Sequence, residues 1–229
     1  MTLILGLRAQ DGVVIGSDRK ILRGFEVEYA PKYYVYEDMV VFFAVGLTGI
    51  VDDFYDLLRA DIRSRKGMES LYEFKIVAED IMYELTRRYA ERVGEDMPAS
   101  VVLAGLENLT YGKARMYYIH SRGYGEHLEF VCTGHGGPYA LSLAKYLLDP
   151  NKDVVENGKR IAYIILWVGE EVDTTVGGKP DVIIIRDREG VPQSENEKIV
   201  ETLPSEVIDQ IAEKVKADKS RLAELLGLA

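Results

Sequence analysis

The second residue of the chain, Thr2, is the first candidate for chemistry. If Met1 is removed, Thr2 carries both a side-chain hydroxyl and a free α-amine. A threonine hydroxyl is a weak nucleophile that needs a base close by, and an α-amine has an ordinary pKa of about 8. The amine can take the hydroxyl proton directly or through water, which makes Thr2 a candidate nucleophile. Because threonine is small, we expect methionine aminopeptidase to remove Met1. If Met1 stays in place, the Thr2 nitrogen is an amide that cannot serve as a base, and the site would be silent.

Other residues with chemically useful side chains or backbones follow, and each has a simpler explanation when it is taken alone. Asp18 ends an apolar run, where an acid is usually a turn residue, and Lys32 could be a solvated charge beside a strand. Gly46 could simply end a strand. The run Gly134-His135-Gly136-Gly137 could be a phosphate-binding loop, but it lacks the Lys-Ser/Thr of a P-loop and the glycine spacing of dinucleotide folds. The interpretation therefore depends on the whole set and its spacing.

In order and spacing, this set resembles the proteasome β-subunit family, including the bacterial two-component proteasome-related peptidase. The resemblance runs from Thr2 to about Asp187, and Asp18 lies sixteen positions after Thr2, as in the family. Lys32 is followed fourteen residues later by Gly46, which is the separation of the family's catalytic lysine and oxyanion glycine. The interval from Thr2 to Lys32 is slightly shorter than usual, so the loop between them must be tighter.

Two further segments complete the resemblance. Thr133-Gly134-His135-Gly136-Gly137-Pro138-Tyr139 is similar to the glycine-rich turn of the bacterial relative, except at His135. Asp173 lies four residues before Gly177-Gly178, and Asp181 opens the expected last strand of the core.

The resemblance implies a role for each member of the set. Thr2 would be the nucleophile, and Lys32, as a buried cation, would lower the pKa of the Thr2 amine. Asp18 would keep Lys32 charged and oriented. The Gly46 amide would stabilise an oxyanion, an effect of about 3 kcal/mol per donor. Asp173 would orient the amine.

Two positions depart from the family. His135 and Val176 stand where the family has serines that support the threonine amine. His135 could be an additional proton acceptor beside Thr2, with a pKa suited to that role, or it could merely fill space in a site that has drifted. We favour the first reading, which requires the His135 ring to lie within one water of the Thr2 amine.

The composition limits the other classes of function. The chain has 229 residues, 47% of them hydrophobic, and a net charge of −10, so an acidic surface argues against nucleic-acid and membrane partners. A single cysteine, Cys132, excludes an intrachain disulfide. We expect no cofactor and no metal, because His120 and His127 flank a turn without a ligand pattern. With no secretory signal in view, we expect a cytoplasmic protein, and scarce Asn and Gln favour a thermophilic source.

The hydrophobic pattern predicts strand pairs, a helix pair, more strands, another helix pair and a last strand. The Asp11-Gly12 dipeptide between two apolar runs is a hairpin signal. Two antiparallel sheets packed together and covered by helices on both outer faces accommodate this order, an α+β, four-layer αββα sandwich, which is also the N-terminal-nucleophile (Ntn) hydrolase fold that the resemblance implies. The expected strands are 3–9, 13–18, 32–37, 39–46, 99–106, 114–120, 128–133 and 182–186, and the expected helices are 50–65, 69–93, 138–148, 154–168 and 204–226.

We therefore expect an Ntn-hydrolase domain at residues 1–203 and a C-terminal helical extension at 204–229. The resemblance implies a threonine peptidase or amidohydrolase that acts on polypeptides and assembles into a homo-oligomeric ring, with an α-type ring or an ATP-dependent unfoldase as a possible partner. Two alternatives stay open. One is a peptide ligase or amidase that uses the same site, and the other is a catalytically silent structural or assembly subunit.

Overall fold

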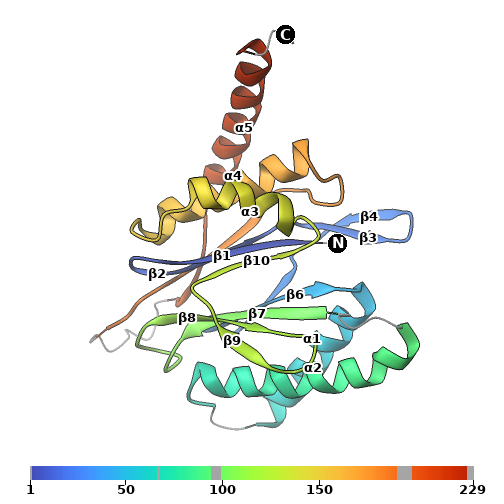
Figure 1. The fold of residues 1–229 in the computed structure, drawn as a ribbon. Helices are drawn as coiled ribbons and strands as arrows, with labels where there is room; N and C mark the ends of the chain where they lie inside the picture. Colours follow the sequence, from blue (N-terminus) through green and yellow to red (C-terminus); the bar gives the residue numbers. More distant parts are fainter. Residues whose placement is uncertain (1, 66–67, 94–98, 190–197, 226–229) are drawn as a thin grey trace.

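Two antiparallel β-sheets lie at the centre of the computed structural model, which describes residues 2–65, 68–93, 99–189 and 198–225 (Figure 1). The first sheet has the strand order β10-β1-β2-β11-β12, and the second has the order β5-β6-β7-β8-β9. A separate two-stranded ribbon is formed by β3 and β4. The strands are β1 (Leu3–Ala9), β2 (Gly12–Ser17), β3 (Lys20–Arg23), β4 (Glu26–Tyr29), β5 (Tyr33–Tyr36), β6 (Val40–Gly46), β7 (Ala99–Leu106), β8 (Ala114–Ile119), β9 (Gly125–His127), β10 (Phe130–Gly134), β11 (Asp181–Arg186) and β12 (Val200–Thr202).

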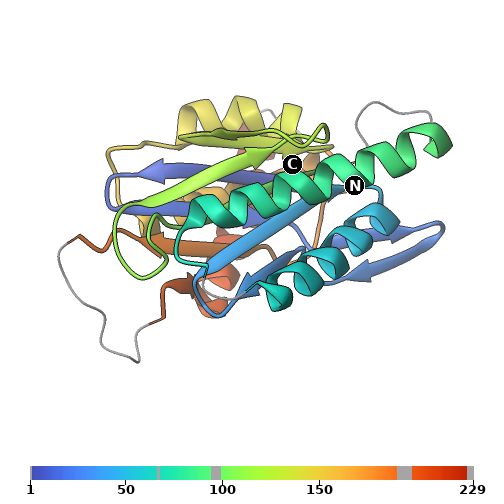
Figure 2. The ribbon, with the colours of Figure 1, turned by 90° about the horizontal axis from the view of Figure 1, so that it is seen from below.

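Helices cover both outer faces of the paired sheets. They are α1 (Thr48–Ser64), α2 (Leu71–Val93), α3 (Gly137–Leu147), α4 (Val154–Glu171) and α5 (Ser205–Leu225). Helices α3 and α4 pack on the first sheet, and α1 and α2 pack on the second (Figures 1 and 2). Helix α5 packs on α4 and projects away from the body. The expected four-layer αββα sandwich is therefore confirmed.

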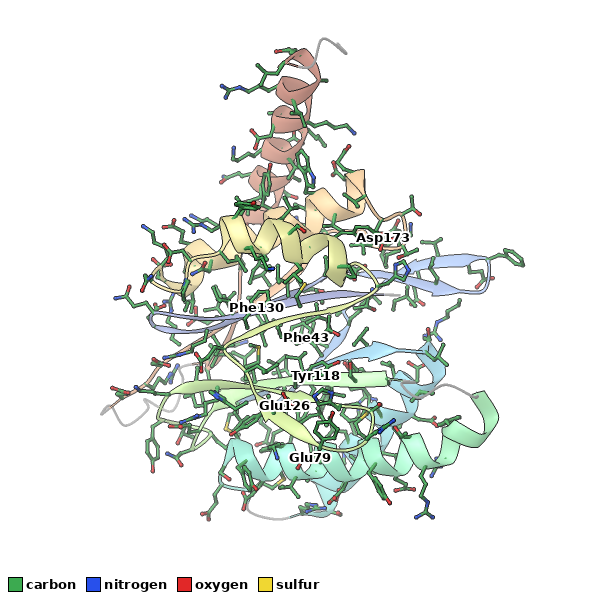
Figure 3. The ribbon with its side chains drawn as sticks, in the orientation of Figure 1. Phe43, Glu79, Tyr118, Glu126, Phe130 and Asp173 are labelled. Atoms are coloured by element: carbon green, nitrogen blue, oxygen red, sulfur yellow. The ribbon has the colours of Figure 1, made fainter. Side chains whose placement is uncertain are left out.

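The sheets are apolar along their length because both faces of each sheet are buried. On β1, Leu3 and Leu5 face the layer of α3 and α4, whereas Ile4 faces the second sheet. On β6, Phe42 packs among the residues of α1 and α2, and Phe43 lies between the two sheets (Figure 3). Successive strand residues point to opposite faces, so a strand with two buried faces reads as a continuous apolar run rather than an alternating one.

Helical periodicity accounts for the outer layers. Helix α1 buries residues three or four positions apart, which form one apolar face, namely Ile50, Phe54, Leu58 and Ile62. Helix α4 is capped at its N-terminus by Asp153, whose side chain accepts a hydrogen bond from the backbone N–H of Glu156 at 2.7 Å. The first half of α5 buries its own apolar stripe in the core that α4 shares. In the described ranges, no helix combines the length and apolar character needed to cross a membrane.

The expected elements are present, although their ends differ, and the structure contains four strands that the sequence did not predict. The Asp11-Gly12 hairpin pairs Ala9 with Gly12. Strand β10 begins two residues later than expected, and α4 continues beyond Val168 to Glu171. Sequence reasoning missed β3, β4, β9 and β12. The ribbon of β3 and β4 pairs only with itself, and residues from Arg23 to Tyr29 are exposed, so it has no continuous apolar run to reveal it.

Candidate active site

The glycine-rich turn encloses the backbone of Thr2 at the start of the first sheet. Leu3 pairs with Gly134 on β10, and the Thr2 carbonyl group lies directly against Gly134. A Cβ at Gly134, whose φ is +88°, would lie 2.1 Å from the Thr2 carbonyl oxygen. Only glycine fits at position 134 for both reasons. Thr2 itself is 5% exposed. The turn therefore holds the Thr2 backbone in place, and a larger residue at position 134 would displace it.

A buried carboxylate, Asp18, joins the first strand of one sheet to Lys32, which precedes the first strand of the other. Its Oδ1 accepts hydrogen bonds from the Lys32 ammonium at 2.7 Å and from the Leu3 N–H at 2.9 Å. Its Oδ2 accepts from the N–H groups of Lys20 and Gly177, both at 3.1 Å. Asp18 is fully buried and Lys32 is 7% exposed. Burial lowers the pKa of Lys32 below its ordinary value, while Asp18 opposes that shift.

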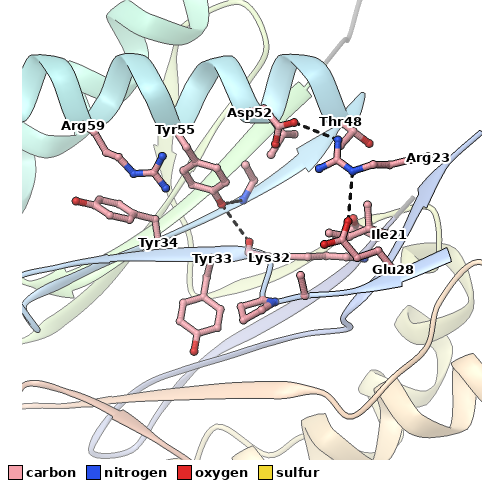
Figure 4. Close-up of a pocket in the computed structure, with 16 residues that line it drawn as sticks. Ile21, Arg23, Glu28, Lys32, Tyr33, Tyr34, Thr48, Asp52, Tyr55 and Arg59 are labelled. Carbon is pink, nitrogen blue, oxygen red and sulfur yellow. Dashed lines mark hydrogen bonds and ion pairs between the residues drawn. The ribbon is translucent and has the colours of Figure 1, made fainter. Parts of the chain in front are cut away.

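A cavity of about 230 Å³ opens beside Thr2 (Figure 4). Lys32 and Gly46 also border it, so three of the sequence-predicted site residues share one cavity. Gly46 ends β6 with a φ of +151°, a conformation that favours glycine. The remaining lining residues are Ile21, Arg23, Glu28, Ala30, Pro31, Tyr33, Tyr34, Ala44, Thr48, Val51, Asp52, Tyr55 and Arg59.

Charged side chains line part of the same cavity. Arg23 on the ribbon reaches Glu28 at 3.4 Å and Asp52 of α1 at 3.3 Å. Arg59 lies over the ring of Tyr34, with its guanidinium carbon 5.1 Å from the ring centroid. The Arg23–Asp52 contact connects the ribbon to α1 across the cavity, and the Arg59–Tyr34 contact connects α1 to β5. A ligand in the cavity would therefore meet an apolar wall and ionic groups together.

His135 and Asp173 form a second group of side chains. His135 Nδ1 lies 2.8 Å from Asp173 Oδ2, and the Thr175 hydroxyl donates to Asp173 Oδ1 at 2.7 Å. The Thr175 N–H donates to the same oxygen at 2.9 Å. Burial pushes the pKa of Asp173 upward, but the hydrogen bonds from Thr175 and His135 outweigh it and leave this pKa below its ordinary value. Asp173 is therefore held as a carboxylate (labelled in Figure 3).

The two groups are joined through a short backbone segment. Val176 donates its N–H to the Asp173 carbonyl at 3.0 Å, and the next residue, Gly177, donates to Asp18. The side chain of Val176 is 1% exposed and packs in the core with Leu3, so it adds no polar group to the site. That the His135 ring lies within one water of the Thr2 amine stays a prediction. Met1 lies outside the described residues.

The other two histidines take part in separate contacts on the second sheet. The His120 ring stacks on Tyr124 with centroids 4.2 Å apart, and its Nε2 lies 3.2 Å from Glu126 without the alignment of a hydrogen bond. His127 lies 3.5 Å from Glu129. Within the part of the chain that the structure describes, no group of three or more His, Cys, Asp or Glu side chains is placed to hold a metal ion.

Sequence reasoning missed three residues that the structure places in or near the site. Thr175 follows Asp173 by two positions, and a hydroxyl at that spacing after an aspartate is a turn signal that could have found it. Arg23 and Tyr55 gave no such signal, because the ribbon and helix α1 bring them to the cavity only in the folded chain.

A sequence model for the family described as "Proteasome subunit" matches residues 2–185. The chain belongs to the proteasome subunit family. A protein described as a proteasome subunit beta from Jonesia denitrificans is 22% identical over 184 residues, which cover 80% of this chain and 60% of that protein. The match thus spans less than two thirds of that relative's length. The resemblance to proteasome-like Ntn hydrolases is confirmed at the level of the family.

Solved structures support the fold across nearly the whole chain. The protein described as Anbu, an ancestral β-subunit, from Yersinia bercovieri superposes with a TM-score of 0.76 at 14% identity, covering 99% of this chain and 97% of that one. A structure described as the helical assembly of the Anbu complex from Pseudomonas aeruginosa gives a TM-score of 0.75 at 16% identity, covering 99% and 96% of the two chains. At these identities the likeness establishes the fold alone.

Proposed function

We propose that this protein is a threonine-type N-terminal-nucleophile peptidase or amidohydrolase that forms an acyl-enzyme at Thr2 after Met1 is removed. The observation that carries the proposal is that Thr2, Lys32 and Gly46 border one cavity, with Lys32 paired to the buried Asp18. Acyl transfer needs a nucleophile, which the Thr2 hydroxyl can supply, and a donor for the oxyanion, which the Gly46 N–H can supply. The Lys32 cation at the same cavity can tune the base.

The proposed reaction begins with proton transfer from the Thr2 hydroxyl to the Thr2 amine, while Oγ1 bonds to the carbonyl carbon of the substrate. The Gly46 N–H stabilises the oxyanion that forms. The carbon–nitrogen bond then breaks, and the ammonium of Thr2 gives its proton to the leaving amine. An ester remains on Oγ1. Water adds to this ester with the amine again as the base, releasing a carboxylic acid and restoring the hydroxyl.

The Lys32 charge favours the neutral form of the Thr2 amine, because two neighbouring cations repel each other. Asp18 fixes the place of that charge through the 2.7 Å contact with the Lys32 ammonium. The His135–Asp173 pair supports the amine in place of the family's serine, with Asp173 orienting the imidazole through Nδ1. In this arrangement the imidazole Nε2 is the nitrogen left to exchange a proton with the amine or a bridging water.

Labelling of the processed protein with a β-lactone tests the proposal. Intact mass first confirms that Met1 is absent. We expect a mass increase equal to one probe, located at Thr2 by peptide mapping, and none in Thr2→Ala. Thr174→Ala, at an exposed threonine in the loop after α4, is the matched control and should be labelled like the unmodified protein.

Failure of the processed protein to react would contradict the proposal and favour the silent subunit. Peptide substrates incubated with and without an added amine separate the remaining alternatives by mass spectrometry. Free carboxylic acid as the main product indicates a hydrolase. New amide in excess of acid indicates a ligase that uses the same residue, whereas an amidase would release free acid from non-peptide amides.

We further propose that the protein assembles into a homo-oligomer. The relative from Pseudomonas aeruginosa is described as a helical assembly. In this chain, Leu222 and Leu225 lie near the end of α5, beyond its buried residues Ile208, Ile211 and Val215, and are 46% and 76% exposed. Exposed leucines on a helix that projects from the body are suited to a contact with another copy. Light scattering and electron microscopy would distinguish a ring from an open helix. A change in mass on adding an α-type ring or an ATP-dependent unfoldase would identify a further partner.

A further inference from the structure

The hydrogen-bond ladder between β5 and β6 is interrupted at the cavity. The register pairs Tyr36 with Val40 at one end and Tyr33 with Phe43 at the other. Continued by one step, the same register would place Lys32 opposite Ala44. A direct bond from the Ala44 N–H to the Lys32 carbonyl would be the ordinary ladder contact at that step.

The hydroxyl of Tyr55 occupies this place instead. It accepts the Ala44 N–H at 3.0 Å and donates to the Lys32 carbonyl oxygen at 3.1 Å. The Phe42 carbonyl oxygen lies 3.3 Å away as a second acceptor. Tyr55 comes from helix α1, and Figure 4 shows its hydroxyl directed toward the Lys32 backbone. Helix α1 therefore supplies the atom that joins the two strands at this point.

This insertion affects the cavity directly. A hydroxyl between a donor and an acceptor holds them farther apart than a direct bond of about 2.9 Å does. Lys32 and Ala44 both line the cavity, as does Tyr55, so the separation of these two backbones contributes to its width. Burial raises the pKa of Tyr55 well above its ordinary value, so the hydroxyl keeps its proton and acts as a bridge rather than as a base.

We propose that Tyr55 is a positioning residue, whose hydroxyl keeps the Lys32 backbone away from β6 and thereby sets both the place of the Lys32 ammonium and the width of the cavity for the acyl group. This inference rests on the proposed function for its catalytic consequence. Tyr55 acts through Lys32 and need not touch the reacting atoms. Without the hydroxyl, the Ala44 N–H and the Lys32 carbonyl would close into a direct bond, because neither buried group can stay unpaired at low cost.

Tyr55→Phe tests this inference in the processed, full-length protein, since it keeps the ring and removes only the bridge. We expect acylation of Thr2 by a β-lactone to slow by about tenfold to a hundredfold, the effect of misplacing a catalytic group by roughly 1 Å. The loss should be greater for a probe with an aromatic side chain than for one with a methyl group, because the cavity narrows. The pH midpoint of acylation should also move, since Lys32 is displaced from the Thr2 amine.

The matched control is Tyr89→Phe, which removes another hydroxyl bound to α1, through Asp53 at 2.5 Å, outside the cavity lining. It should leave the rate, the size preference and the pH midpoint unchanged. p-Aminophenylalanine at position 55 restores a hydrogen-bonding group at the same place and should recover the rate and the size preference. It also carries the test if Tyr55→Phe does not fold.

Equal acylation of Tyr55→Phe and the unmodified protein by both probes, with one pH midpoint, would overturn the inference. An equal loss for both probes with an unmoved midpoint would do the same, because that is the pattern of a merely structural residue. If the unmodified protein itself does not react, the proposed function fails instead. A crystal structure of Tyr55→Phe then decides the inference, which requires a direct bond from the Ala44 N–H to the Lys32 carbonyl.

Discussion

Replacing Asp18 by asparagine removes the charge that Lys32 faces and keeps the shape of the side chain. Asp18 is fully buried and accepts four hydrogen bonds, one of them from the Lys32 ammonium. An asparagine amide nitrogen donates rather than accepts, so the donors on one side of the side chain would meet another donor. Removing one partner of a buried ion pair costs about 3–5 kcal/mol. We expect Asp18→Asn to lower the free energy of unfolding by about 4 kcal/mol.

Urea denaturation measures this change. A Thr2→Ala background keeps the proposed peptidase from hydrolysing its own unfolded chains during the measurement. Lys32→Met in the same background leaves the carboxylate its three backbone donors and should cost less. The double variant should be more stable than the sum of the two single changes predicts, by about 2 kcal/mol, because the buried ammonium is then gone. Asp181→Asn is the matched control. Its partner Arg19 has 37% of its side chain exposed, so its loss should cost about 1 kcal/mol or less.

The pH dependence of stability gives an independent check on the same pair. Burial already places the pKa of Lys32 below the ordinary 10.5, and loss of Asp18 should lower it further. Between the folded pKa and 10.5 the unfolded chain binds more protons, so the stability of Asp18→Asn should rise with pH across that window. A cost below about 1 kcal/mol, or additive single changes, would refute the view that the Asp18–Lys32 contact anchors this site.

Three further predictions concern other parts of the molecule. His135→Ala should slow acylation of Thr2, because no imidazole is then available to exchange a proton with the amine, whereas an unchanged stopped-flow rate would remove His135 from the chemistry. Asp187→Asn should lower the free energy of unfolding at pH 7 by about 1–2 kcal/mol, because Asp187 binds Arg8 through two hydrogen bonds of 2.7 and 2.5 Å. Burial raises the Asp187 pKa, but the Arg8 contact outweighs it and leaves this pKa below 3.8. The difference in stability from the unmodified protein should therefore shrink as pH falls from 3.8 and disappear below the folded pKa. A difference that persisted in acid denaturation would contradict the assignment. Leu222→Glu with Leu225→Glu should leave the melting temperature unchanged and lower the mass of the oligomer in light scattering, and an unchanged mass would exclude the end of α5 from the interface.

The sequence predicted the two-sheet core because its strands carry their own signal. The runs that became β1, β6 and β7 are buried on both faces and therefore continuously apolar, and Asp11-Gly12 marks the first hairpin. The spacing of Thr2, Asp18 and Lys32 could be recognised because it reflects fixed strand lengths. The structure brings Asp18 and Lys32 into contact and places Thr2 and Lys32 at one cavity, while their catalytic roles remain predictions.

Other features could not be predicted because they depend on contacts between distant segments. The ribbon of β3 and β4 pairs two short strands that mix charged and apolar residues, and its residues from Arg23 to Tyr29 are exposed, so its sequence resembles that of a loop. Tyr55 lies one position from the buried Phe54 on α1 and is indistinguishable from an ordinary core aromatic until the neighbouring strands are in place. The Arg23–Asp52 contact joins two elements whose relative position no local pattern specifies.

Asp18 and Tyr55 divide the positioning of Lys32 between them. Asp18 fixes the ammonium end and at the same time fixes β1 through Leu3 and the loop after α4 through Gly177. Tyr55 fixes the backbone end through the carbonyl of the same lysine, from a helix on the far side of the second sheet. A long, flexible side chain loses most of its rotamer freedom when both ends are held. The position of the cation at the Thr2 cavity is therefore set by both sheets, by helix α1 and by the loop after α4, which explains why segments from across the sandwich, and not a local motif, are needed to build the site.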